Sequence, residues 1–220
     1  MKKCLFLLCV LFANTYCFTQ QLNKDSLLQL LSATREDTSK VKLYLILSDQ
    51  YLKDNLDEAE KYAKLGGGLS KKINYQKGIY NYYSSYQDVL MRKGKFDSVL
   101  LVGREALSMA RNNAESAEIG RTMLNMGIAY KLLEDFDNAI VYIEEARDIL
   151  IKSGEHRWDG KAYNLLQLVY YSMHQYRKGI DNGIQAVKIY TKQNNKEDLQ
   201  YAYNNLALNY IMTKQYDSAR

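Results

Sequence analysis

The apolar residues of this chain recur with a 40-residue period, which indicates one repeated structural unit. Small or compact residues occupy one position of each unit, namely Ala59, Val99, Ala139, Gly179 and Ala219. A bulky residue stands three places before each of them: Leu56, Phe96, Phe136, Tyr176 and Tyr216. The last unit has only begun where the sequence ends, so we expect this chain to be a piece of a longer protein.

Inside one unit the apolar residues are spaced three and four apart, which predicts helices. Met126 and Tyr130 share one helical face, Ala139 and Ile143 share another, and the polar turn Glu134–Asp135 separates them. Each such hairpin has an apolar face that it cannot bury alone, so neighbouring hairpins must stack. We expect helix pairs at 40–53 and 57–73, 77–93 and 97–112, 116–133 and 137–153, and 158–173 and 177–193, followed by a helix at 197–213.

The unit beginning at Met126-Gly127, with Tyr130, Ala139 and Ala146 at their spacings, resembles the tetratricopeptide repeat (TPR). The resemblance covers residues 40–220 and implies an all-α, right-handed α-solenoid of antiparallel helix pairs with 40-residue repeats. Two features depart from the family: its repeats have about 34 residues, and its proline is missing because the chain contains no proline. HEAT-like repeats, which have about this longer length, are the alternative.

The N-terminus predicts export. Lys2 and Lys3 precede an apolar run, Cys4–Ala13, that is too short to span a bilayer and is typical of a secretory signal. We expect a signal peptide at 1–20, a capping helix at 21–36 and a TPR-like array of about four and a half repeats at 37–220. The mature protein would lie in the periplasm or on the extracytoplasmic side of the membrane. All three cysteines lie in the leader, so no disulfide is expected in the mature chain.

The glycine run Gly66-Gly67-Gly68 superficially suggests a phosphate-binding loop. The order of residues that such a loop requires is missing, and no strand precedes it. Gly66 fits a small position of the repeat, but Gly67 and Gly68 do not. Each costs about 1 kcal/mol against alanine in a helix, so we expect fraying or a kink within 61–73.

Composition and motifs argue against chemistry in this segment. The formal net charge of +5 includes two lysines of the leader, and the remainder is too small to indicate nucleic acid or anionic lipid. His156 and His174 stand in a linker and a turn without a second metal ligand at helical spacing. No acid–base pair or nucleophile motif is present. We therefore expect no catalysis, no metal and no cofactor.

The resemblance places a binding surface on the inner face of the first helix of each pair. Most tyrosines fall at core positions, among them Tyr83, Tyr130 and Tyr203, whereas Tyr51 falls at an inner position. The expected binding face is polar and mildly basic, and it consists of Asn81, Ser84, Asp88, Arg92, Arg121, Leu124, Lys131, Lys161, Asn164, Tyr171, Tyr201 and Asn204.

Three of these residues, Arg121, Lys131 and Lys161, could attract an acidic segment of a protein or peptide. The five-residue arrangement of lysine, asparagine and arginine with which some family members hold chaperone tails is not found. Neither nucleic acid nor a direct membrane contact is expected for this segment.

The order of leader, short leucine-rich helix and repeats resembles the exported sensory region of bacterial sensor histidine kinases and of LuxR-type regulators. It implies a non-catalytic binding scaffold in a longer signalling protein. Two alternatives stay open: a stand-alone periplasmic or secreted adaptor, and the accessory region of an enzyme whose catalytic domain lies beyond residue 220.

Overall fold

The computed structural model describes residues 23–109, 117–154, 156–215 and 218–219, with only the backbone at residue 157. The described segments contain ten α-helices, one short 3-10 helix and no strand. The helices are α1 (Lys24–Ala33), α2 (Thr38–Tyr51), α3 (Leu56–Lys72), α4 (Gln76–Arg92), α5 (Phe96–Met109), α6 (Ala117–Leu132), α7 (Phe136–Ser153), η1 (His156–Trp158), α8 (Asp159–Ser172), α9 (Tyr176–Lys192) and α10 (Lys196–Met212). The expected signal peptide lies outside these residues. No described helix combines the length and the apolarity needed to cross a bilayer.

Most of the described connections between helices are tight turns that reverse the chain. The αL conformation, with positive φ, occurs at matching places in these turns, at Asn74, Gly94, Glu134, Gly154, His174, Asn194 and Lys214. In most of these turns the following amide closes a bond to the carbonyl five residues back, as from Tyr75 to Ser70 at 2.8 Å. This is the Schellman arrangement, which satisfies the last carbonyls of a helix.

The next helix in several pairs begins at a capping side chain. The side chains of Asn55, Asp135 and Asn195 accept hydrogen bonds from the amides three residues later, at 3.1 to 3.2 Å. Such caps satisfy helix amides that have no partner inside the helix. Together the turns and caps fix each helix antiparallel to the one before it.

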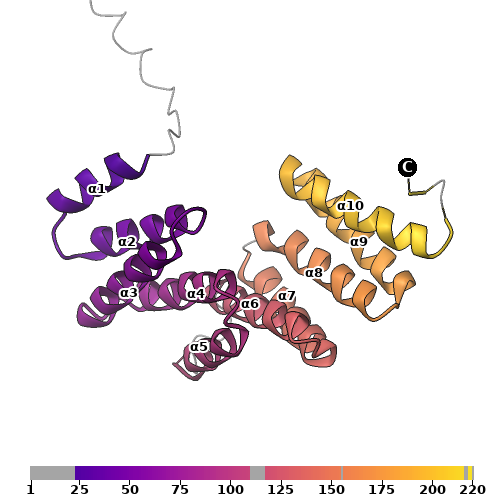
Figure 1. Ribbon diagram of the computed structural model, residues 1–220, viewed down its shortest axis with the longest axis horizontal. Helices are drawn as coiled ribbons and strands as arrows, with labels where there is room; N and C mark the ends of the chain where they lie inside the picture. Colours follow the sequence, from indigo (N-terminus) through magenta and orange to yellow (C-terminus); the bar gives the residue numbers. More distant parts are fainter. Residues whose placement is uncertain (1–22, 110–116, 155, 216–217, 220) are drawn as a thin grey trace, which may run out of the picture.

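The even-numbered helices form one layer and the odd-numbered helices α3, α5, α7 and α9 form the other. Each even-numbered helix packs on the next, from α2 to α10, and on its odd-numbered partners. The ribbon curves into an arch whose two ends are α1 and α10 (Figure 1). This confirms the all-α solenoid of antiparallel pairs predicted from the sequence.

The small repeat positions lie where helices cross closely. Ala59, Val99 and Ala139 are fully buried, and Gly179 is buried as well. The Cβ that any larger residue would add at Gly179 would overlap Oδ1 of Asn209 on α10. Close approach of the axes therefore explains the regular spacing of small residues.

The helix α3 continues through the glycine run, and the fraying or kink expected within 61–73 stays a prediction. Gly67 has a packing reason that the repeat pattern did not reveal: a Cβ on it would lie 2.5 Å from the ring of Tyr82. Gly68 is different, since no atom lies within 4 Å of the position of its Cβ. Packing with α4 thus accounts for Gly67 and leaves Gly68 unexplained.

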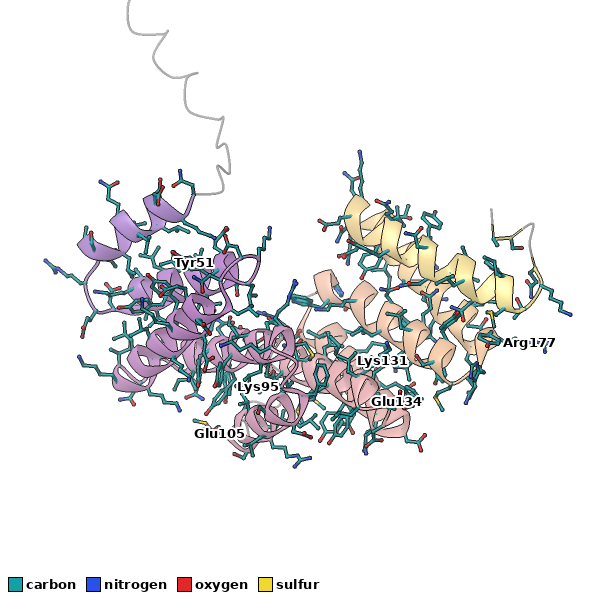
Figure 2. All side chains as sticks on the ribbon, in the orientation of Figure 1. Tyr51, Lys95, Glu105, Lys131, Glu134 and Arg177 are labelled. Atoms are coloured by element: carbon teal, nitrogen blue, oxygen red, sulfur yellow. The ribbon has the colours of Figure 1, made fainter. Side chains whose placement is uncertain are left out.

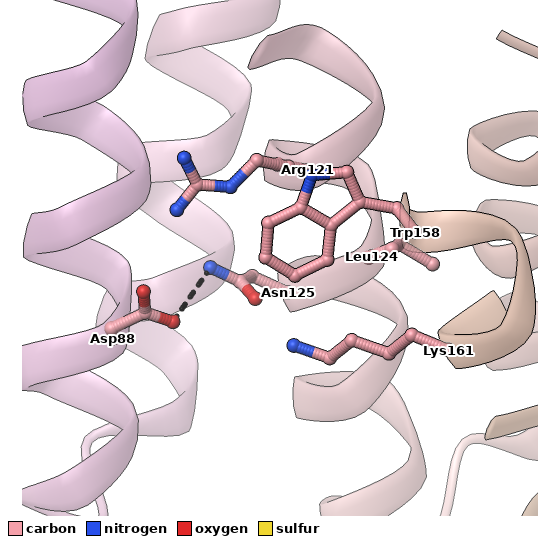
Figure 3. A pocket seen from close by; sticks show the side chains of 6 residues that line it. All are labelled: Asp88, Arg121, Leu124, Asn125, Trp158 and Lys161. Carbon is pink, nitrogen blue, oxygen red and sulfur yellow. Dashed lines mark hydrogen bonds between the residues drawn. The ribbon is translucent and has the colours of Figure 1, made fainter. Parts of the chain in front are cut away.

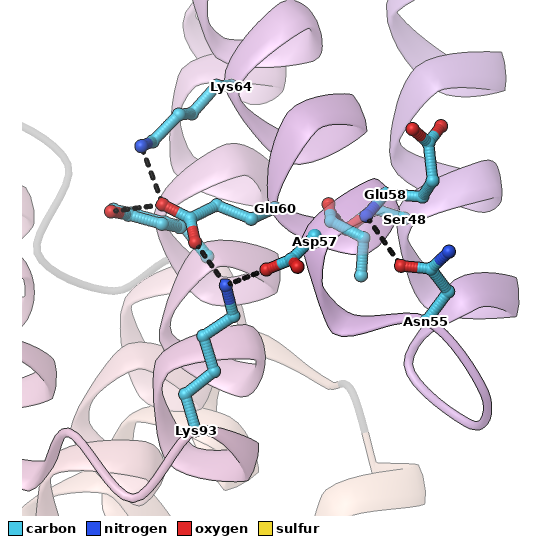
Figure 4. Close-up of polar contacts among 9 residues, drawn as sticks. Ser48, Asn55, Asp57, Glu58, Glu60, Lys64 and Lys93 are labelled. Carbon is cyan, nitrogen blue, oxygen red and sulfur yellow. Dashed lines mark hydrogen bonds and ion pairs between the residues drawn. The ribbon is translucent and has the colours of Figure 1, made fainter.

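An ion network links the first and second repeats (Figure 4). The Lys93 ammonium lies 2.7 Å from Asp57 and 2.7 Å from Glu60, and Lys64 lies 2.6 Å from Glu60. Hydrogen bonds from Lys64 and Lys93 lower the pKa of Glu60 to about 2. The positions equivalent to Lys93 in later repeats hold Leu133, Met173 and Thr213, so the charged junction is specific to this end of the array.

The tyrosines follow the predicted division into core and inner positions only in part. Tyr83 and Tyr130 are buried as expected. Tyr51, expected at an inner position, is partly buried and stacks on Tyr62 with ring centroids 5.5 Å apart. Tyr203 is 52% exposed because no described helix covers that side of α10.

Candidate binding face

A cluster of charged and aromatic side chains lies where α4, α6 and the start of α8 meet on the inner layer (Figure 3). It surrounds a small pocket lined by Asp88, Arg121, Leu124, Asn125, Trp158 and Lys161. The pocket volume is about 20 Å³, enough for about one water molecule. Ligand pockets for small molecules are typically several hundred cubic ångströms or larger. The geometry therefore suits one protruding group of a larger partner.

Trp158 holds two cationic side chains against its indole. The guanidinium carbon of Arg121 lies 4.9 Å from the ring centroid, and the ammonium of Lys161 lies 5.1 Å from it. Such contacts are attractive because the ring face carries partial negative charge. Among the described residues, no carboxylate oxygen lies within 4.0 Å of either cation. Both positive charges are therefore held on the indole without an ion pair to any described residue.

Asp88 faces this pair of cations from α4. Its carboxylate accepts a hydrogen bond of 3.0 Å from the Asn125 side-chain amide, drawn as a dashed line in Figure 3. Burial raises the pKa of Asp88, and the charges of Lys161 and Arg121 oppose that rise. Burial also lowers the pKa of Lys161, against the opposing effect of Asp88. The cluster is thus a set of coupled charges in a poorly solvated part of the surface.

A second carboxylate, Asp49, reaches the same region from α2. The Ser85 hydroxyl approaches its oxygen at 3.5 Å. The surrounding protein raises the pKa of Asp49 to about 6, mainly by desolvation and then by repulsion from Asp88. Arg121 and the bond from Ser85 act in the opposite direction. Two like charges therefore meet at the contact of α2 with α4.

Asparagines bridge adjacent inner helices at two places along the array. Asn125 of α6 bonds to Asp88 of α4, and Asn205 of α10 donates to the Asn164 side-chain oxygen of α8 at 3.1 Å. Asn125 and Asn205 occupy the same position of the 40-residue repeat, two repeats apart. They keep polar side chains in register along the inner layer.

The structure brings together only some of the residues predicted for the binding face. Asp88, Arg121, Leu124 and Lys161 line one pocket, although Leu124 is 1% exposed. Ser84 is fully buried and offers no surface to a partner. Lys131 lies ten residues beyond Arg121 on α6, about 15 Å along the axis, near the turn where Figure 2 also labels Glu134.

The remaining predicted residues lie on α4, α8 and α10, outside the pocket. Asn81 and Arg92 lie on α4, Asn164 and Tyr171 on α8, and Tyr201 and Asn204 on α10. Arg92, Tyr201 and Asn204 are exposed, while Asn81, Asn164 and Tyr171 are partly buried. Tyr171 packs against Tyr176 with ring centroids 5.7 Å apart. These residues extend the face without joining the central cluster.

Sequence reasoning missed three members of the cluster. Asn125 could have been found from its repeat position, which Asn205 shares. Trp158 is the single tryptophan of the chain, and its place at the start of an expected helix gave no sign of a binding role. Asp49 occupies a repeat position that holds buried apolar residues in the next repeats, Val89, Ala129 and Val169. A charge at such a position was the available signal.

No group of three or more potential metal ligands occurs among the described residues. His156 contacts Asp159 at 3.0 Å, and His174 contacts the Tyr176 hydroxyl at 2.7 Å. Both histidines are exposed, and neither lines the pocket.

Stacked antiparallel helix pairs with small residues at their crossings and a polar inner layer define a TPR-like α-solenoid. Residues 118–192, which cover most of α6 and all of α7, α8 and α9, match the family model "Tetratricopeptide repeat". No curated protein sequence matches the chain.

Solved structures share the architecture at low sequence identity. BtubC (BKLC) from P. vanneervenii matches with a TM-score of 0.70 and 20% identity, over 89% of this chain and 82% of that one. A signal transduction ATPase with numerous domains and a tetratricopeptide repeat sensor, from Pyrococcus horikoshii, matches with a TM-score of 0.69 and 22% identity, over 89% of this chain and 31% of that one.

A Rap protein complexed with Competence and Sporulation Factor matches with a TM-score of 0.69 and 15% identity. That match covers 89% of this chain and 66% of the Rap protein. At these identities the similarities establish the fold.

Proposed function

We propose that this chain is a non-catalytic binding module that holds a segment of a protein or peptide on its inner face. The observation that carries the proposal is the pair of cations, Arg121 and Lys161, which lie on Trp158 with no ion pair in the part of the chain that the structure describes. A pocket for a single protruding group lies beside them, and amide side chains continue along the inner layer. An acidic side chain of the partner is the group that this arrangement favours.

The Rap structure supports this proposal as a precedent for the fold, because it is a complex with Competence and Sporulation Factor. The Pyrococcus protein is a second precedent, since its repeats are described as a sensor. Neither precedent identifies the partner of this chain. The chemistry of the cluster supplies the more specific expectation of an acidic segment.

Charge reversal tests the acidic segment directly. The probe is a short fluorescein-labelled peptide of glutamate and glycine, compared with the same peptide carrying glutamine for glutamate. Arg121→Glu and Lys161→Glu should each weaken binding of the glutamate peptide about ten-fold or more, most strongly at low salt, because attraction becomes repulsion. Fluorescence anisotropy provides the dissociation constants.

Two lysines provide matched controls for this experiment. Lys188→Glu makes the same charge change at an exposed position of α9 and should leave binding unchanged. Lys131→Glu should have a small effect, because Lys131 lies outside the cluster. Full retention of binding by both cluster variants, each shown by circular dichroism to be folded, would refute the proposed site.

We also propose that the module is the exported sensory or interaction region of a longer bacterial signalling protein. The basic and apolar leader motivates the export, and the sensor repeats of the Pyrococcus ATPase motivate the signalling role. Expression in a bacterium followed by fractionation tests the export. A mature N-terminus between Cys17 and Gln21 in the periplasmic fraction is expected, and recovery of the full-length chain from the cytosol would contradict it.

A further inference from the structure

The charged residues of the central inner face are sorted by helix. Asp49 and Asp88 come from α2 and α4, whereas Arg121 and Lys161 come from α6 and α8. Asp49 accepts from the Ser85 hydroxyl and is repelled by Asp88, and the two cations meet on the ring of Trp158. An acidic patch, Asp49 with Asp88, therefore lies next to a basic patch, Arg121 with Lys161.

The two patches do not neutralise each other by direct contact. Asp88 accepts from Asn125, and Asp49 from Ser85. Within the described part of the chain, neither carboxylate has a cationic nitrogen within 4.0 Å. Within the described residues, each patch is therefore left without a direct ion pair.

We propose that the segment bound on the inner face carries charges of both signs, with a basic side chain on Asp49 and Asp88 and an acidic side chain on Arg121 and Lys161. This inference rests on the binding function proposed above and specifies the charge pattern of the partner. A purely acidic segment would satisfy the basic patch but would meet repulsion from Asp49. A segment with both charges satisfies both patches at once.

The proposal makes the binding depend on pH through Asp49. The groups that face Asp49 are Ser85 and Asp88, both on α4, and Arg121 on α6. Asp88 in turn is surrounded by Arg92, Arg121, Asn125 and Lys161. Because the pKa of Asp49 is raised to about 6, its carboxyl is ionised above that pH and increasingly neutral below it. A basic side chain of the partner favours the ionised form, so its contribution is lost as the pH falls through about 6. Repulsion of an acidic partner is lost over the same range.

Two labelled peptides of equal length separate these effects. One carries lysines in one half and glutamates in the other, and the second carries glutamates throughout. At neutral pH the wild-type chain should bind the mixed peptide more tightly. Asp49→Asn should weaken binding of the mixed peptide about three- to ten-fold and tighten binding of the glutamate peptide, since it removes one charge from a partly desolvated site. Lowering the pH below the pKa of Asp49 should likewise weaken binding of the mixed peptide to the wild-type chain and tighten binding of the glutamate peptide.

Asp181→Asn is the matched control, because Asp181 is an exposed aspartate on α9. It should leave both dissociation constants at the wild-type value. Equal affinity of Asp49→Asn and wild type for both peptides, or a wild-type preference for the glutamate peptide, would overturn the inference. Either result would leave the binding function standing if Arg121→Glu still abolished binding. Unchanged binding by Arg121→Glu would instead remove the function on which the inference rests.

Discussion

The hairpins α4–α5 and α6–α7 fill equivalent helix crossings in opposite ways. In the first, Gln87 of α4 lies over Gly103 of α5, and a Cβ on that glycine would approach the amide nitrogen of Gln87 at 2.7 Å. In the second, the glycine is on the inner helix: a Cβ on Gly127 would lie 2.5 Å from Cγ1 of Ile143. The pair of α8 and α9 returns to the first solution, with Gln167 over Gly183.

We infer that these three crossings keep a similar combined volume and differ in which helix supplies the glycine. The α2–α3 crossing holds Leu47 and Ala63 at the same positions and has no glycine. The Leu/Met-Gly pattern that resembles the family appears in α6, where the inner residue is Gly127. The crossings of α4–α5 and α8–α9 hold a buried glutamine at that position, 0% exposed in each case. A pattern search based on that glycine therefore detects one hairpin better than its neighbours.

Replacing the glycine–isoleucine crossing of α6–α7 by the glutamine–glycine crossing of α4–α5 should produce the largest change in stability. Gly127→Gln places a long side chain against Ile143 and should destabilise the fold by about 3 kcal/mol. Adding Ile143→Gly recreates the arrangement of α4–α5 and should recover more than half of that loss, with a residual cost from the apolar surface that is no longer buried. Midpoints of thermal unfolding by circular dichroism measure both effects. Equal midpoints for the single and double variants would contradict the idea of a fixed combined volume.

Alanine at the two glycines should distinguish a stiff crossing from an adaptable one. Gly127→Ala should cost about 2 kcal/mol, because the nearest atom belongs to a β-branched side chain and the Ala139 carbonyl oxygen lies 3.3 Å away. Gly103→Ala should cost less, about 1 kcal/mol or below, since it meets flexible ends of Met126 and Gln87 and gains helix propensity. Urea unfolding of both variants measures the order, and the reverse order would contradict this explanation.

The smallest expected effect concerns the buried glutamines. Gln87 donates to the Val99 carbonyl at 3.1 Å, whereas both polar atoms of Gln167 lack a hydrogen-bond partner among the described residues. Gln167→Met should therefore be neutral or stabilising by up to about 1 kcal/mol, and Gln87→Met should be less favourable than that. Thermal midpoints of the two variants provide the comparison. A clear loss of stability in Gln167→Met alone would show that its amide has a partner outside the described residues.

The sequence predicted the helix pairs well because their signals are local and repeated. Apolar spacing and small residues at crossings recur in every 40-residue unit, and the expected first and last residues of most helices lie within a few positions of the observed ones. Gly67 could not be explained from the repeat pattern, because its packing partner, the ring of Tyr82, lies on another helix. The stacking of Tyr51 on Tyr62 was not foreseen for a similar reason, since Tyr62 belongs to the following helix.

The candidate site was predictable only to the level of a helix face. The resemblance to the repeat family implied that Arg121 and Lys161 face inward, but it could not show that Trp158 brings both cations together. It also grouped Lys131 with them, although ten residues of helix separate Lys131 from Arg121. Burial of Ser84 and Leu124 depends on how closely neighbouring inner helices pack, which a single repeat does not reveal. Contacts between repeats decide the site, and these are the least local part of the fold.

The αL residues at the turns have a consequence for how such a chain can change length. From Glu134 to Lys214 an αL residue follows every α-helix, so the turn repeats once per helix. The pattern of side chains repeats only once per helix pair. Gain or loss of a whole pair preserves the alternation of layers. Gain or loss of a single helix would exchange the two layers for every helix that follows and turn the binding cluster outward. Insertions between α3 and α9 that keep the binding cluster on the inner layer should therefore contain an even number of helices.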